Sequence, residues 1–384
     1  MKAINIKLIM IFLIFSSMGI SQEVKENSRQ NGHLNINKFR QMYQEFSSPN
    51  MFRTAAGAPG PAYYQQQADY KMDIELDDRN KRISGSETIT YTNNSPDNLE
   101  YLWVQLDQNV RKKDSPSLIR DGDGVSPAYD PSGFTNKFIN EPFDGGFNIE
   151  YVKDVNGKVL TFFINQTMMR IDLPEVLKSG EKVSFSMKWW YNIQDHVNQA
   201  GRSGYETFES DGNRSYIIAQ FFPRMAVYNE IEGWQNYQFW GNGEFALPFG
   251  NYEVKITVPA DHILDATGEL QNRKEVFSKD MLKRYNKAKK SYDKPIMIVT
   301  QAEAEEAEKN FSKDKNTWHF KAQNVRDFAF ASSRKFLWDM MAVKVGNKDV
   351  MAVSLYPKEG NPLWEDYSTI AVAETLKTYS SFTF

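Results

Sequence analysis

Residues 70–77 read YKMDIELD, and this short stretch decides the fold class. Charged side chains alternate in it with apolar ones, which are Tyr70, Met72, Ile74 and Leu76. A period of two predicts a half-buried β-strand, because successive side chains of a strand point to opposite faces. The Asp-Asp-Arg-Asn sequence at residues 77–80 predicts the turn that ends the strand.

Strand patterns of the same kind follow along most of the chain, separated by turns of Gly, Pro and Asn. The candidate strands are residues 87–91, 99–106, 147–152, 159–164, 168–173, 183–191, 216–221, 252–258, 263–266 and 350–355. Strands at this spacing predict a mainly β fold, built as an antiparallel β-sandwich or a saddle-shaped sheet. A loop rich in Asp, Gly, Ser and Pro, residues 114–146, interrupts the series.

Helical patterns occur in three places. Ser278 is a candidate N-cap for a helix that runs to Ala288, and residues 302–309 (AEAEEAEK) predict a charged, solvated surface helix. Near the end, Asn361 is a candidate N-cap with Pro362 at the first helical position. The last strand and helix are too small to bury an apolar face alone, so we expect residues 336–384 to begin a further domain that is incomplete here.

The N-terminus has the features of an export signal. Lys2 and Lys7 precede an apolar run, residues 8–15 (LIMIFLIF), and the small residues Gly19 and Ser21 follow it. This order predicts a signal peptide over residues 1–21, cleaved before Gln22, and therefore a periplasmic or extracellular protein. An uncleaved N-terminal anchor is the alternative. No second apolar run of this length follows, so we expect no membrane span after cleavage.

Residues 22–67 are expected to be an irregular leader. Residues 55–61 (AAGAPGP) are too rich in Gly and Pro for a helix or a central strand, and Gln65–Gln67 add a low-complexity tract. One short helix is expected around residues 36–46. The candidate β domain then runs over residues 68–335.

Composition excludes several classes of function. The chain of 384 residues has 41% apolar and 25% charged residues and a net charge of −3, so no basic field is large enough to indicate nucleic acid binding. It contains no cysteine, which excludes thiol nucleophiles, cysteine zinc sites, disulfides and a lipoprotein anchor.

The residues show no complete catalytic or metal site. The histidines are His33, His196, His262 and His319. None lies within five residues of another, so the His-Glu-x-x-His pattern that places two zinc ligands on one helix face is absent. His196, His262 and His319 could share a metal only if the fold brought them together. Composition leaves a Ser-His-Asp arrangement open, although the chain has no Gly-x-Ser-x-Gly elbow.

The chain between residues 219 and 270 resembles the N-terminal β domain of the aminopeptidase N family, the gluzincin zinc metallopeptidases of the membrane alanyl aminopeptidase type. The matching blocks are residues 220–224 (QFFPR), 233–234 (GW), 243–245 (GEF), 249–254 (FGNYEV), 256–259 (ITVP) and 266–270 (ATGEL). Residues 68–109, 317–339 and 357–384 agree with the same family. Together these blocks extend the resemblance over about residues 65–384.

The resemblance implies a β domain that packs against a thermolysin-like catalytic domain of α+β type. That domain carries the zinc ligands and hydrolyses peptides that have a free N-terminus. Its motifs do not occur in this chain. We therefore expect zinc and peptide substrate to bind a longer parent protein, while this chain binds no metal and is inactive alone. Related epoxide hydrolases share the resemblance.

One substrate-binding residue is carried over. The family places a Gln or Glu of the β domain beside the substrate's N-terminal residue, and Gln220 occupies that position. A Gln that only pairs locally is the alternative. Arg326-Asp327 is interpreted as an ion pair at the rim of a sheet. A competing hypothesis is a stand-alone exported β-sandwich that binds peptide or glycan on exposed aromatic residues such as Trp189 and Trp190.

Overall fold

A computed structural model describes residues 49–116, 128, 130–135, 139, 143–197, 201, 203–241 and 246–383. The chain divides into two compact units, Met1–Pro61 and Ala62–Phe384. The expected signal peptide, the short helix at 36–46 and the block at 243–245 lie outside the described residues. Domain boundaries after residues 21, 67 and 335 stay predictions.

The described part of the first unit, residues 49–61, consists of turns. The Gly57 amide donates to the Thr54 carbonyl oxygen at 3.0 Å, and Arg53 bridges to Pro59. Such tight turns suit the Gly- and Pro-rich composition of the segment.

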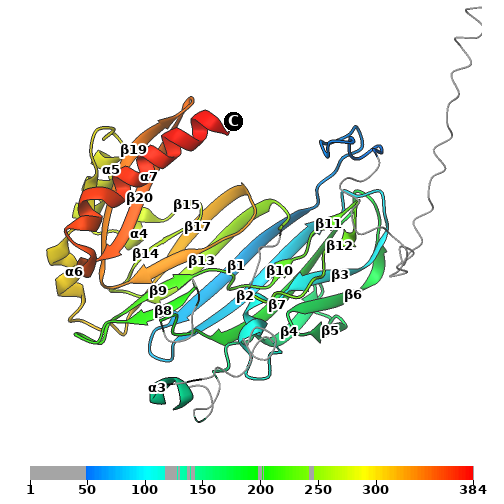
Figure 1. The fold of residues 1–384 in the computed structure, drawn as a ribbon, viewed down its shortest axis with the longest axis horizontal. Helices are drawn as coiled ribbons and strands as arrows, with labels where there is room; N and C mark the ends of the chain where they lie inside the picture. Colours follow the sequence, from blue (N-terminus) through cyan, green and yellow to red (C-terminus); the bar gives the residue numbers. More distant parts are fainter. Residues whose placement is uncertain are drawn as a thin grey trace, which may run out of the picture. The chain divides into compact units, whose positions relative to one another are not determined.

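The second unit is mainly β, as predicted, and Figure 1 shows its strands gathered into several sheets. A seven-stranded sheet has the order β15-β17-β13-β1-β2-β7-β4. Its strands are β15 (Glu269–Leu270), β17 (Lys315–Val325), β13 (Gly250–Pro259), β1 (Gln67–Asp77), β2 (Arg82–Thr92), β7 (Lys182–Asn192) and β4 (Asn148–Asp154). The pairing is antiparallel except between β1 and β13, which run parallel.

Smaller sheets complete the β structure. A four-stranded sheet has the order β10-β3-β6-β5, namely β10 (Arg224–Met225), β3 (Leu99–Gln105), β6 (Met168–Leu177) and β5 (Phe162–Asn165). A second has the order β14-β18-β9-β8, namely β14 (Ile263–Ala266), β18 (Phe330–Ser333), β9 (Arg214–Ile218) and β8 (Gly204–Thr207). A three-stranded sheet joins β16 (Ile296–Val299), β19 (Phe336–Val345) and β20 (Lys348–Pro357), and β11 (Tyr228–Asn229) pairs with β12 (Gly233–Trp234).

Strand β1 shows why these sheets stack. Every apolar position of β1 from Tyr70 to Leu76 is buried, whereas Lys71, Asp73 and Glu75 are exposed. The same hydrophobic cluster contains Leu102 and Val104 from β3 and Met187 from β7. The seven-stranded sheet and the β3 sheet therefore share one core, as in a β-sandwich.

Helices occur between the later strands and at the end of the unit. The Ser278 hydroxyl accepts from the Met281 amide and caps α5 (Lys279–Ala288), as predicted. Thr300 and Glu303 form a capping box at the start of α6 (Gln301–Ala307). Shorter helical segments are η1 (Asp107–Arg111), α3 (Pro131–Phe134), α4 (Arg273–Val276) and η3 (Lys358–Gly360).

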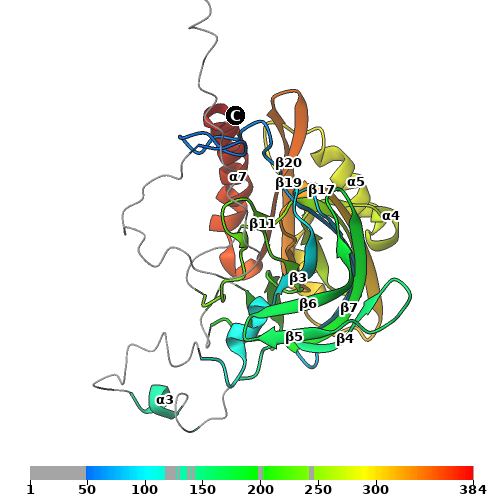
Figure 2. The same cartoon turned by 90° about the vertical axis from the view of Figure 1, so that its right-hand side faces the viewer.

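The last helix, α7 (Leu363–Phe382), lies along β19 and β20 (Figure 2). The prediction that Asn361 caps this helix is wrong by one residue, because Pro362 occupies the cap position. The Asn361 side-chain amide instead donates to Gln301 and Glu365. Within the described residues, no helix is long and apolar enough to cross a membrane.

Candidate functional site

The segment that leaves β9 positions Gln220. The predicted strand over residues 216–221 ends at Ile218, so Gln220 lies after the strand. Its φ of +54° is in the left-handed region, which residues other than Gly adopt seldom and which is costly unless the surroundings hold it.

Two polar side chains hold this turn. The Gln108 side-chain amide donates to the Gln220 carbonyl oxygen at 2.9 Å. The Ser203 hydroxyl lies 3.0 Å from the Ala219 amide nitrogen and 3.1 Å from the Ala219 carbonyl oxygen. The Gln220 side chain is half-buried, and no described residue hydrogen-bonds to its side-chain amide group. The backbone is therefore fixed while the side chain stays available to a ligand.

A buried ion-pair network lies four residues further on. The Arg224 guanidinium donates twice to Asp107, at 2.8 and 3.1 Å, and once to Asp327, at 2.6 Å. Arg224 and Asp107 are both buried. Burial acts to lower the pKa of Arg224, but attraction to Asp107 and Asp327 outweighs it and raises that pKa. The network ties η1 and the loop before β18 to residues 221–225.

Aromatic packing completes the base of this segment. The Tyr70 hydroxyl accepts from the Met225 amide at 2.9 Å, and its ring meets Phe222 edge-on at 5.4 Å. Glu87 is buried in the same core, and burial raises the pKa of its carboxyl well above that of an exposed glutamate. Burial therefore disfavours the charged form of Glu87.

The interpretation of Arg326-Asp327 as an ion pair is wrong. These residues lie in the loop between β17 and β18, and the Asp327 carboxylate pairs with Arg224. The Arg326 guanidinium lies over the Phe249 ring, 4.5 Å from its centroid. Neighbours in an irregular segment point in different directions, so the pair that adjacency suggested does not form.

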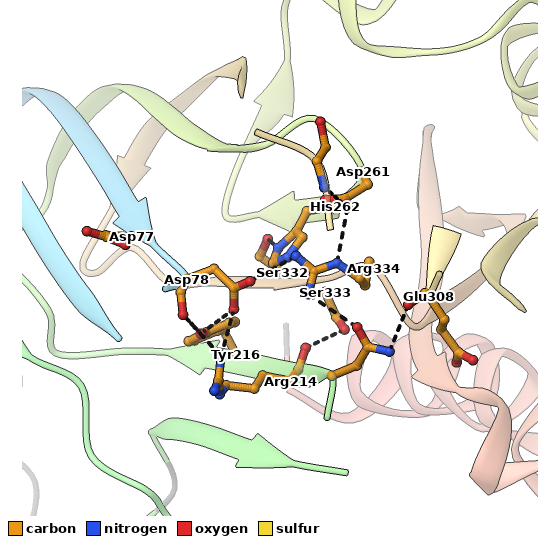
Figure 3. A network of polar contacts seen from close by, with 12 residues as sticks. Asp77, Asp78, Arg214, Tyr216, Asp261, His262, Glu308, Ser332, Ser333 and Arg334 are labelled. Carbon is orange, nitrogen blue, oxygen red and sulfur yellow. Dashed lines mark hydrogen bonds and ion pairs between the residues drawn. The ribbon is translucent and has the colours of Figure 1, made fainter. Parts of the chain in front are cut away.

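A second polar network surrounds His262 and contains a serine–histidine pair. His262 Nδ1 lies 3.0 Å from the Ser332 hydroxyl. The nearby Asp261 carboxylate bonds to Arg334 and to the Ser312 amide. Figure 3 shows Arg334 between Asp261 and Asp78. His262 and Ser332 are buried, so this arrangement is not a nucleophilic site for a substrate from solution.

The residues present do not fit a zinc ion. His196 and His319 pair with Glu206 and Glu253, and His262 pairs with Ser332, so these histidines do not share a point in the described structure. Among described residues, one carboxylate group could hold a cation: Asp211, Glu308 and Glu359. The buried Lys335 ammonium already contacts all three, at 2.5, 2.8 and 2.9 Å.

Trp189 and Trp190 do not form the exposed aromatic surface that the hypothesis of a stand-alone binding module requires. Trp189 is fully buried between Phe147 and Tyr191. Trp190 is half-buried, and the Arg82 guanidinium covers its ring at 4.1 Å from the centroid. These two tryptophans therefore offer no open platform to a sugar or a peptide.

The residues that hold Gln220 were not found from the sequence. Asp107, Gln108 and Asn109 follow the apolar strand β3 directly, and all three are buried. Buried polar groups need hydrogen-bond partners, so a polar triplet that continues an apolar strand was the available signal. Their partners Gln220 and Arg224 lie more than a hundred residues away and gave no local indication.

Comparisons with known proteins find matches among solved structures. No protein-family model matches the chain, and no curated protein does. The chain is similar to a crystal structure of an M1 zinc metallopeptidase from Deinococcus radiodurans, at 11% identity and a TM-score of 0.40 over 78% of this chain and 49% of that one. A mutant of that enzyme bound to a Tyr-Ser-Ala substrate gives 11% and 0.43 over 80% and 52%. The chain thus spans about half the length of these structures.

Proposed function

We propose that the chain is the N-terminal portion of an exported zinc metallopeptidase, an aminopeptidase that removes N-terminal residues from peptides. In this proposal the described sheets form its β domain, and the zinc-binding residues belong to the part of the parent protein that follows. Gln220 receives the ammonium group of the substrate. The ordered sequence blocks between residues 220 and 270 support the assignment.

The observation that carries the proposal is the conformation of Gln220. Gln108 holds the backbone of this left-handed glutamine close to the ion pairs of Arg224, while its side chain has no hydrogen-bond partner among the described residues. Its side-chain carbonyl oxygen is an acceptor, which is what an ammonium group requires. The Gln220 amide itself carries no charge.

The residues of this chain perform no hydrolytic step in the proposal. The described histidines lie apart from one another, and the Lys335 ammonium contacts the acidic group of Asp211, Glu308 and Glu359. These residues therefore supply no metal site. In this proposal the chain binds and orients the peptide substrate. A hydrogen bond to the ammonium group distinguishes a free N-terminus from an internal peptide bond, which is the selectivity of an aminopeptidase.

The proposal is tested first with the chain alone. Residues 22–384 should purify without stoichiometric zinc and should release no 4-nitroaniline from alanine-4-nitroanilide. The gene should encode His-Glu-x-x-His downstream of Phe384, and its full product should hydrolyse the reporter with zinc bound. Zinc-dependent turnover by residues 22–384 alone would refute this division of labour.

The role of Gln220 is tested in the full gene product. Because hydrogen bonds to charged groups are worth about 1.5–3 kcal/mol, Gln220→Ala should raise KM for alanine-4-nitroanilide by about tenfold or more. We expect kcat to change much less. Gln166 is also left-handed but sits in the β5–β6 turn, so Gln166→Ala is the matched control. Equal effects of both changes would remove Gln220 from the substrate site.

Export is tested by the mature N-terminus. N-terminal sequencing of the protein from the periplasm or medium should begin at Gln22. A protein that keeps residues 1–21 and stays with the membrane would support the uncleaved anchor instead.

A further inference from the structure

Amide side chains from four distant segments gather around one cavity at an end of the seven-stranded sheet. The cavity has a volume of about 340 Å³ and lies where β1 and β13 begin and where β2 and β17 end. Besides Phe249 and Gly250, its lining consists of amides: Gln65, Gln66, Gln67, Asn94, Asn251 and Asn324. The Gln65–Gln67 tract and the Asn-Ser-Pro turn at residues 94–96 thus meet in space.

Part of this wall is rigid. Gln66 is buried, and its side chain donates to Asn93 at 3.1 Å and accepts from the Asn94 amide at 2.6 Å. Asn251 donates to Asp69 at 3.1 Å and accepts from the Asn324 amide at 3.2 Å. These bonds hold the turn after β2 and the ends of β13 and β17 in place before any ligand arrives.

Other polar groups of the lining remain available. No described residue hydrogen-bonds to the side chain of Asn324, which is exposed and left-handed with a φ of +53°. The side-chain oxygens of Gln67 and Asn94 also accept no hydrogen bond from described residues. The cavity therefore offers donors and acceptors together, and none of the described residues that line it carries a charge.

We propose that this cavity binds a neutral saccharide of one or two rings. A hydroxyl group both donates and accepts, which matches an amide side chain. The Phe249 ring is the one apolar side chain of the lining, and the Arg326 guanidinium lies over one of its faces, so the amides are the main contacts that the cavity offers. The volume lies at the lower end of the range of about 300–1,000 Å³ for small-ligand sites, which suits a ligand of this size.

A peptide fits the site less well. Extended peptides commonly bind by adding a strand to an open sheet edge. The strands β2, β1 and β13 are interior in the order β15-β17-β13-β1-β2-β7-β4, so none of these three strands offers a free edge at the cavity. The lining residues themselves carry no charge, and the charged neighbours Asp69 and Arg326 are engaged with Asn251 and with the Phe249 ring. This inference does not depend on the proposed peptidase function.

Saturation-transfer difference NMR tests the proposal with the 22–384 polypeptide. The probes are maltose and N,N′-diacetylchitobiose, with triglycine amide as the peptide comparator. We expect saturable transfer to at least one disaccharide and none to triglycine amide. Absence of transfer to both disaccharides, or transfer to triglycine amide alone, overturns the proposal.

Variants of Asn324 test whether disaccharide binding occurs in the cavity. Asn324→Gly removes the free amide and keeps a residue that accepts a positive φ, so it should weaken disaccharide binding by about 3–10-fold. Asn324→Asp keeps the shape and removes the donors, and should also weaken binding. Gln166→Gly is the matched control, because Gln166 is an exposed amide with a φ of +53° outside the cavity. Binding unchanged in both Asn324 variants, or weakened equally by Gln166→Gly, overturns the proposal.

Discussion

Single residues specify this fold most strongly where charge is buried. Asp107 is completely buried, and its partner Arg224 comes from 117 positions later in the chain. A buried charge without a partner is expensive, whereas a paired one costs little. The pair therefore selects against arrangements of η1 and residues 221–225 that separate the two groups. The same geometry places Gln220.

Arg224→Met is expected to lower the free energy of unfolding by about 3–5 kcal/mol, since it leaves the buried Asp107 carboxylate unpaired. Urea unfolding followed by tryptophan fluorescence measures the change. Lys188→Met is the control, because Lys188 pairs with Glu150 at 2.8 Å on an exposed surface. Surface pairs contribute about 0–1 kcal/mol, so the control should unfold almost as the parent does. Similar losses in both variants would contradict a special role of the buried network.

The buried His262 predicts the direction in which the stability of the protein changes with pH. Burial, followed by the charge of Arg334, lowers the pKa of His262 from 6.5 to about 4, against the opposing effects of Asp78 and Asp261. Between these pH values the unfolded chain binds a proton that the folded protein does not. The contribution of His262 to stability is thus complete above about pH 6.5 and is lost as the pH falls toward 4, by up to roughly 1.4 kcal/mol per unit.

The test is urea unfolding of the parent and His262→Gln at several pH values between 4 and 7. Burial raises the pKa of Asp265 to about 6, within this range, so the difference between the two proteins is the informative quantity. We expect the parent to lose stability more steeply than the variant as the pH falls. Parallel curves would mean that His262 is not held neutral.

Elements differ in how well the sequence predicts them. The alternation in β1, β7 and β13 is strong, because each strand has one buried face, and these strands were predicted. The end of β9 was misplaced, since the apolar residues Phe221 and Phe222 continue the strand pattern although their backbone has left the sheet. The parallel pairing of β1 with β13 was also missed, because it depends on contacts between residues about 180 positions apart.

The site was less predictable than the strands. Gln220 was selected from a sequence resemblance, and nothing local indicated its left-handed backbone or its bond to Gln108. The amides around the cavity looked like a low-complexity leader and a turn. Their meaning depends on the sheet register that brings Gln67 beside Phe249.

A substitution at Gly250 tests the register between β1 and β13. A Cβ atom at Gly250 would lie 1.6 Å from the Ala68 carbonyl oxygen, so β1 and β13 can pair here only with glycine. Gly250→Ala should destabilise the protein by about 1–3 kcal/mol or more and reduce disaccharide binding. Thermal unfolding and the NMR assay measure the two effects. Gly133→Ala, where the nearest atom lies 3.5 Å away, should leave both unchanged, and equal behaviour of the two variants would contradict the close approach.

At the scale of the whole molecule, α7 leaves an apolar stripe uncovered. Leu363, Tyr367 and Ile370 lie on one face, spaced four and three residues apart, and their exposed fractions are 61%, 63% and 44%. The helix buries only Thr369 and Ala373 completely, and the Thr369 hydroxyl donates to Asp339 and lies 2.8 Å from the Ser354 hydroxyl. We expect a stripe of this kind to be covered by a partner.

Without such a partner, the purified 22–384 polypeptide should associate through this stripe. Sedimentation velocity should show concentration-dependent association, and Tyr367→Lys combined with Ile370→Lys should weaken it at least about tenfold, because burying each apolar side chain is worth roughly 1.5–3 kcal/mol. Val155→Lys, which changes an apolar residue that is 73% exposed near the β4–β5 turn, should have no effect. A polypeptide that stays monomeric at high concentration would show that the stripe needs no cover. Loss of association with the α7 change, but not with the control, would locate the surface through which the polypeptide associates.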